Sequence, residues 1–197
     1  ERTKSRPIAS GKISVKKSLI YVFLLCATAF LILIQFNLNT IILGLASMPF
    51  AFSYPLMKRF TYWPQLFLGI TFNYGLILGW TSIKSELDIV PIIFYFGAIF
   101  WTLGYDTIYG YQDIKDDEII GLKSTSIKFK GKEKNFLITC YIFLILLFLL
   151  GGYFMKLNNI YFILFIIPIF HLFFYQLKIF NSKNSESCLR AFKSNNF

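Results

Sequence analysis

Six long apolar stretches dominate this sequence and limit the folds that are open to it. They lie near residues 18–35, 39–56, 64–83, 89–109, 136–155 and 159–179. Each stretch approaches or exceeds the ~20 residues that a helix needs to cross about 30 Å of hydrocarbon. Only 15% of the residues are charged, whereas soluble domains average about 25%. The sequence therefore predicts an all-α fold, a polytopic transmembrane helix bundle with six spanning helices in a lipid bilayer.

The basic residues predict how this bundle is oriented. Residues 1–17, the 57–63 turn, residues 106–135 and the tail from residue 178 together hold 18 of the 20 lysines and arginines. The alternate connections hold only Lys84 and Lys156. This is the positive-inside pattern, so we expect the basic side, both chain ends and the 106–135 segment to be cytoplasmic. The net charge of +10 reflects this topology, and nucleic-acid binding is not indicated.

Residues 105–129, YDTIYGYQDIKDDEIIGLKSTSIKF, concentrate the acidic side chains. They hold four aspartates within twelve residues, namely Asp106, Asp113, Asp116 and Asp117. On a helical template, spacings of three, four and seven recur on one face, so these carboxylates would repel one another without a cation between them. Mg²⁺ characteristically binds one or two carboxylates together with the phosphate oxygens of a substrate. The alternative is an ordinary charged loop in which acids and lysines are solvated.

Cations and acids converge on the expected cytoplasmic face. The Lys58–Arg59 pair and the basic N-terminal segment join the aspartates there, although that segment could equally be a topogenic flank. Asp106 lies at the end of an apolar run, where an ionisable group is costly and usually functional. The combination indicates a site for a lipid diphosphate. A channel or transporter would place polar residues at mid-helix depth, whereas the centres of these runs are apolar.

The cysteines and the single histidine indicate no further site. Cys26 and Cys140 lie in apolar runs and Cys188 lies in a polar tail, with no spacing typical of a disulfide framework or a zinc site. His171 stands alone in an apolar run, and we interpret it as a helix-packing residue.

Four segments of the sequence carry a resemblance to a known family. They are ERTKSRPIASGKIS at the N-terminus, YPLMKRFTYWPQLFLG at 54–69, the 105–129 stretch, and CLRAFKSNNF at the C-terminus. In this order they resemble the UbiA superfamily of intramembrane prenyltransferases. The resemblance implies a bundle of roughly nine helices, six of them present, in a single domain over residues 1–197 that is incomplete at both ends. It also implies two Asp-rich motifs, of which 105–129 holds the second; the first, of NDxxDxxxD type, is expected upstream of this chain.

The resemblance implies Mg²⁺-dependent transfer of a polyprenyl group from polyprenyl diphosphate to 4-hydroxybenzoate. This is a step of ubiquinone biosynthesis, expected here at the bacterial inner (cytoplasmic) membrane. By resemblance, Asp106, Asp113 and Asp117 are the catalytic metal ligands. Substrate-binding roles carry over to Arg6, Arg59, Tyr109 and Lys123.

Some alternatives stay open at this point. Asp116 could simply be solvated, Tyr109 could be an interfacial anchor, and Lys58 is interpreted as a topogenic charge. An enzyme of the same fold could use another acceptor, such as haem or a naphthoate. The chain could also be an inactive truncated remnant, because the first Asp-rich motif is not among its 197 residues.

Overall fold

The computed structural model describes residues 4–196, and all regular structure in that range is helical. Six segments are long and apolar enough to span a membrane: Val15–Leu33, Leu38–Phe60, Pro64–Lys84, Ile89–Gly110, Glu133–Phe154 and Asn159–Ile179. They coincide with the six apolar runs of the sequence. The predicted all-α transmembrane bundle is therefore confirmed.

Several spans are built from more than one helix. The first is α1 (Val15–Leu33), and the second joins α2 (Leu38–Ser53), a 3₁₀ turn at Tyr54–Leu56 and α3 (Met57–Phe60). The third joins α4 (Pro64–Phe72) and α5 (Tyr74–Lys84), and the fourth is α6 (Ile89–Gly110). Two short helices, α7 (Ile114–Ile120) and α8 (Thr125–Lys128), precede the fifth span, α9 (Glu133–Phe154). The sixth joins α10 (Asn159–Leu164), α11 (Ile166–Phe170), a π-helical turn at His171–Gln176 and α12 (Leu177–Ile179). The C-terminal segment is α13 (Ser185–Lys193) with a 3₁₀ turn at Ser194–Asn196.

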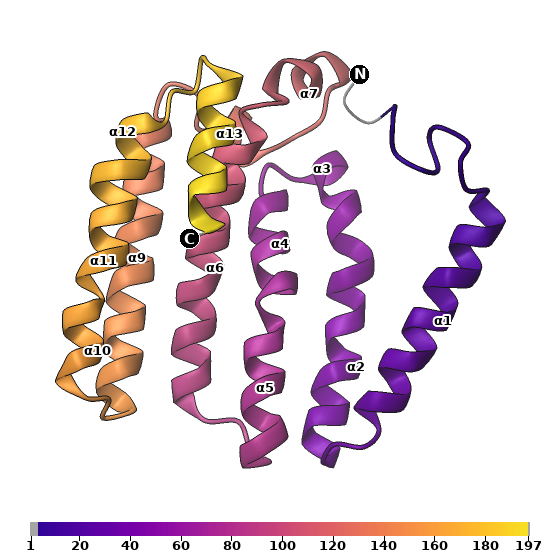
Figure 1. Cartoon of the computed structure of the whole chain (residues 1–197), viewed down its shortest axis with the longest axis vertical. Helices are drawn as coiled ribbons and strands as arrows, with labels where there is room; N and C mark the ends of the chain where they lie inside the picture. Colours follow the sequence, from indigo (N-terminus) through magenta and orange to yellow (C-terminus); the bar gives the residue numbers. More distant parts are fainter. Residues whose placement is uncertain (1–3, 197) are drawn as a thin grey trace.

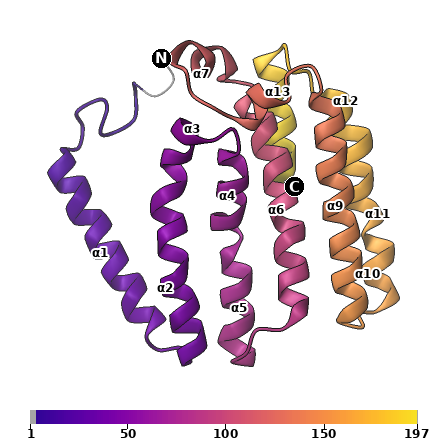
Figure 2. The same cartoon turned by 180° about the vertical axis from the view of Figure 1, so that it is seen from behind.

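The basic segments gather at one end of the bundle. Figure 1 shows α3, α7 and the start of α13 at the same end, with the α1–α2, α5–α6 and α9–α10 connections at the other. The view from behind in Figure 2 shows α1 leaning away from α2 toward the basic end. None of the residues of α1 is buried, so its apolar side chains are left to the lipid. We call the end with α3 and α7 the basic end.

Helix α6 is the most buried of the six spans, since α4, α9 and α13 pack around it. Two glycines bring α9 close to it. A Cβ on Gly97 would lie 2.6 Å from the Phe148 ring, and one on Gly104 would lie 2.7 Å from the Tyr141 ring. Small residues at helix contacts are a main source of packing in membranes, where hydrophobic burial between helices contributes little. The close packing fixes the position of α6, and Asp106 lies in its last turn.

The third span breaks at Asn73, which no apolar pattern predicts. The side-chain nitrogen of Asn73, Nδ2, donates to the Gly69 carbonyl oxygen (2.8 Å), to the Ala98 carbonyl oxygen (3.2 Å) and to Thr102 Oγ1 (2.8 Å). Irregular backbone is tolerated at membrane depth only where protein groups satisfy it. These hydrogen bonds hold the interrupted part of the third span against α6.

The polar tail of the sequence is an amphipathic helix that packs on α6. Cys188 and Ala191 of α13 are buried, and burial raises the pKa of the Cys188 thiol to about 11. Gln176 connects the sixth span to this helix by donating to the Ala191 carbonyl oxygen (2.9 Å). His171 Nε2 lies 3.2 Å from Ser194 Oγ, so the histidine sits at a contact between segments, as we interpreted it.

Candidate functional site

The aspartates surround the junction between α6 and α7. The helix is interrupted at residues 111–113, so the four acids do not share one helix face, and the continuous helical template behind their spacing is wrong. Asp106 in the last turn of α6 and Asp113 at the N-cap of α7 are half-buried. Asp117 is buried within α7, and Asp116 is exposed.

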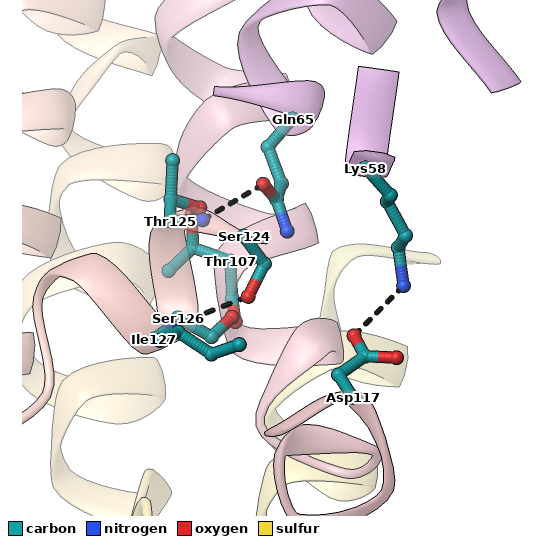
Figure 3. Close-up of polar contacts among 8 residues, drawn as sticks. All are labelled: Lys58, Gln65, Thr107, Asp117, Ser124, Thr125, Ser126 and Ile127. Atoms are coloured by element: carbon teal, nitrogen blue, oxygen red, sulfur yellow. Dashed lines mark hydrogen bonds and ion pairs between the residues drawn. The ribbon is translucent and has the colours of Figure 1, made fainter. Parts of the chain in front are cut away.

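Lys58 forms an ion pair with the most buried of these acids. Its Nζ lies 2.9 Å from Asp117 Oδ2 (Figure 3), and its charge also acts on Asp106. The side chains of Lys58 and Asp117 are 41% and 9% exposed, and a pair with one exposed partner stabilises the fold by at most about 1 kcal/mol. The pair therefore matters for the charge distribution more than for stability. The topogenic interpretation of Lys58 missed this contact.

Backbone contacts hold the two sides of this ion pair together. The Lys123 N–H donates to the Lys58 carbonyl oxygen (2.8 Å), and Lys123 Nζ donates to the Phe60 carbonyl oxygen (3.4 Å). Gly121 ends α7 with φ +77°, a left-handed conformation that glycine adopts without strain. This conformation turns the chain back toward α3. Lys123 is half-buried as a result.

The KSTS sequence after this turn is a buried polar cluster rather than a solvated loop. The Thr125 N–H donates to Gln65 Oε1 at 3.0 Å (Figure 3). The Thr125 and Thr107 hydroxyls lie 2.6 Å apart, and the Ser126 hydroxyl donates to the Thr107 carbonyl oxygen (2.8 Å). Because these groups are buried, each bond lies in a low local dielectric and fixes the segment firmly. Sequence reasoning missed Gln65 and Thr107, since no pattern marks them.

The other predicted residues lie at the same end but contribute differently. Arg6 and Arg59 are exposed. Tyr109 is half-buried, and its ring centroid is 4.7 Å from that of Phe192 on α13. The structure thus pairs Lys58 with Asp117, whereas the substrate-binding roles of Arg6, Arg59, Tyr109 and Lys123 stay predictions.

The carboxylates have the donor atoms that Mg²⁺ prefers, but those in the described part of the chain are too few and too far apart to form a complete ligand set. Across residues 4–196, no three His, Cys, Asp or Glu side chains gather closely enough to hold a metal ion. Carboxylate oxygens are nevertheless the donors that Mg²⁺ prefers, and it commonly leaves its other positions to substrate phosphates and water. Asp106, Asp113 and Asp117 therefore suit Mg²⁺ as individual donors, of which one or two would share an ion whose other positions substrate oxygens or further acids fill.

The model of the UbiA prenyltransferase family matches residues 1–197. The chain belongs to this family. The mitochondrial 4-hydroxybenzoate polyprenyltransferase of Rattus norvegicus is 47% identical to this UbiA chain over 138 residues, which are 70% of the chain and 37% of that protein. The 4-hydroxybenzoate geranyltransferase 2 of Lithospermum erythrorhizon is 39% identical over 198 residues, which cover 99% of the chain and 64% of that protein. The UbiA chain thus spans between about a third and about two thirds of these relatives' length.

The fold of this UbiA chain also has a solved counterpart. The apo structure of a UbiA homolog from Aeropyrum pernix K1 superimposes with a TM-score of 0.82 at 20% identity, covering 98% of this chain and 72% of that chain. At this identity the likeness concerns the fold alone. It supports the helix arrangement around α6 on which the candidate site depends.

Proposed function

We propose that this UbiA chain is part of an enzyme that transfers a polyprenyl group from polyprenyl diphosphate to 4-hydroxybenzoate, with Mg²⁺, in ubiquinone biosynthesis. The observation that carries the proposal is the Lys58–Asp117 ion pair at the basic end of the bundle, the end at which α6 presents Asp106. Acids that can bind Mg²⁺ and basic side chains that can bind phosphate lie together at the end of an apolar bundle, and this combination suits a lipid diphosphate. The names of the rat and Lithospermum relatives support the choice of 4-hydroxybenzoate as acceptor.

The acids and the lysines would divide the work of binding the diphosphate. Asp106, Asp113 and Asp117 would supply carboxylate oxygens to Mg²⁺, one or two of them to an ion, and the bound metal would neutralise the diphosphate and make it a better leaving group. Lys58 would then leave Asp117 for a phosphate oxygen, together with Lys123, since an ammonium binds phosphate as a point charge. Arg59 and Arg6 would add guanidinium groups, which suit bidentate contact with phosphate or with the acceptor carboxylate.

The protein must also protect the prenyl carbocation, which forms when the diphosphate leaves, from water. The allylic C–O bond breaks, the diphosphate leaves with the electron pair, and the acceptor ring attacks the carbocation at the carbon ortho to its hydroxyl before losing a proton. Tyr105, Tyr109 and Phe192 cluster at this end of α6, and aromatic faces stabilise cations. The surrounding apolar spans would keep water away from the carbocation.

The proposed setting is a bacterial inner membrane, with the basic end toward the cytoplasm. The charge distribution supports this orientation. The rat relative carries "mitochondrial" in its name, so a mitochondrial membrane is the alternative setting.

The test is a transfer assay on membranes that contain the complete reading frame encoding this chain. It supplies a polyprenyl diphosphate and 4-hydroxybenzoate, with Mg²⁺ or with a chelator. We expect prenylated 4-hydroxybenzoate only with Mg²⁺. Product with a naphthoate or haem acceptor, and none with 4-hydroxybenzoate, would contradict the proposed acceptor while keeping the reaction type.

One observation favours a second candidate, an inactive remnant. The described residues do not supply a group of three potential metal ligands. Both candidates predict no product from the 197 residues alone, so the assay on the complete reading frame separates them. Absence of product from the complete reading frame as well would favour the remnant.

A further inference from the structure

A polar pocket of about 480 Å³ lies at the basic end of the bundle, where α9 begins and the sixth span ends. Figure 1 shows these two helix ends side by side, next to the loop that leads into α13. Its walls include Lys132, Lys134 and Lys178, with Phe180 and Ser182. None of the residues of the candidate prenyl-transfer site lines it.

The height of the pocket in the membrane follows from the spans that flank it. The fifth span begins at Glu133 and the sixth ends at Ile179, so the lining residues lie at the boundary between hydrocarbon and water. This is the level of lipid headgroups, outside the ~30 Å apolar core.

The pocket carries excess positive charge. Its single acid, Glu133, accepts a hydrogen bond from the Ser182 hydroxyl (2.9 Å) and lies in the field of Lys183. The three lysines of the wall are exposed, and none of them forms an ion pair with another residue of the described range 4–196. An anionic ligand would therefore meet three unneutralised ammonium groups.

Two features near the residues that line this pocket suit a lipid. Phe170 and Phe174, which precede Lys178 in the same span, stack with centroids 5.3 Å apart and are each 63% exposed. They offer an aromatic surface to an acyl chain. The Tyr111 ring packs against Phe180, which lines the pocket, with ring centroids 5.6 Å apart, and the buried Tyr111 hydroxyl has no hydrogen-bond partner among the residues that the structure describes. Such a group calls for a bound water or a ligand oxygen.

We propose that this pocket binds the headgroup of an anionic phospholipid from the surrounding leaflet. Basic pockets between spanning helices on the positive side of a membrane suit such headgroups, because the lysines meet the phosphate while the acyl chains stay in the bilayer. The proposal does not depend on the prenyl-transfer activity.

The test measures how tightly the purified chain in detergent binds phosphatidylglycerol, by native mass spectrometry. The variant Lys132→Gln/Lys134→Gln/Lys178→Gln removes the positive wall. Its matched control, Lys12→Gln/Lys16→Gln/Lys17→Gln, removes the same charge from exposed positions near the N-terminus. We expect the tightest phosphatidylglycerol to bind the pocket variant at least about tenfold more weakly than wild type, with the control unchanged.

A variant that is expected to bind the lipid more tightly shows whether weaker binding in the pocket variant could come from misfolding alone. Glu133→Gln removes the one acid among the described residues that line the pocket and should tighten phosphatidylglycerol binding, which a misfolded protein would not do. Equal binding of phosphatidylcholine, or equal losses in both triple variants, would overturn the proposal. So would displacement of the lipid by equimolar glycerol phosphate, since the pocket would then serve a soluble phosphate ligand.

Discussion

Lys58 connects the two halves of the candidate site, because it lies on the α3 turn and pairs with an acid of α7. The partner acid is largely buried, while the lysine is exposed enough to move. A lysine so placed can neutralise Asp117 in the absence of metal and a phosphate oxygen in its presence. The charges at the site then stay balanced in both conditions.

Lys58→Gln tests that role. The change keeps a polar side chain and removes the charge, so we expect the KM for polyprenyl diphosphate to rise about ten- to hundredfold, the equivalent of one charge-assisted hydrogen bond. Steady-state kinetics on the complete reading frame measures it. Lys115→Gln, at an exposed position of α7, is the control and should behave like wild type. An unchanged KM in Lys58→Gln would remove the lysine from the site.

Gly110 is the residue at which α6 meets the buried KSTS segment. A Cβ there would collide with Ser126 Oγ and lie 3.2 Å from Gln65 Nε2. We expect Gly110→Ala to lower the free energy of unfolding by about 1–3 kcal/mol, the usual effect of overpacking. Gly79→Ala, whose Cβ would meet no atom within 4 Å, is the control in thermal unfolding in detergent. Equal stability of the two variants would contradict the close packing.

Among the helices, α4 and α6 hold the segment that carries the acids. Gln65 of α4 accepts the buried Thr125 N–H, and Gln65→Leu would leave that donor unsatisfied at a cost of about 1–3 kcal/mol. We expect faster hydrogen exchange across residues 122–127 in this variant. Gln35→Leu is the control, since the exposed Gln35 side chain, just beyond α1, donates to the nearby Leu31 carbonyl oxygen and, within the described part of the chain, forms no hydrogen bond with α4 or residues 122–127. Unchanged exchange in Gln65→Leu would show that α4 does not hold the segment.

The spans could be predicted from the sequence, whereas their interruptions and side contacts could not. Length and hydropathy suffice to predict a spanning helix, because in lipid its backbone groups must form their hydrogen bonds within the helix itself. The break at Asn73 depends on Ala98 and Thr102, which lie more than twenty residues along the chain. The Lys58–Asp117 pair and the amphipathic α13 on α6 likewise depend on neighbours distant in sequence. The acidic stretch could be singled out, but not the turn at 111–113 that divides it.

The molecule as a whole has one basic end and one nearly neutral end, and this asymmetry predicts its orientation. Ile119, 85% exposed on α7, and Glu86, exposed in the α5–α6 connection, lie at opposite ends. In a Cys26→Ala background, Ile119→Cys should react with a membrane-impermeant maleimide only after the membrane is permeabilised, so that the reagent reaches the cytoplasmic side. Glu86→Cys should react in intact cells. The reverse pattern would place the acids outside the cell.

The central claim is that the acids at the basic end form part of a metal and diphosphate site. Neighbouring aspartates provide the most direct measurement, because Asp117 is buried against Lys58 while Asp116 is exposed. Mg²⁺-dependent transfer to 4-hydroxybenzoate is compared for Asp117→Asn and Asp116→Asn in the complete reading frame. We predict a loss of at least about hundredfold in kcat/KM for Asp117→Asn, with Asp116→Asn close to wild type. Wild-type turnover in Asp117→Asn would contradict the account.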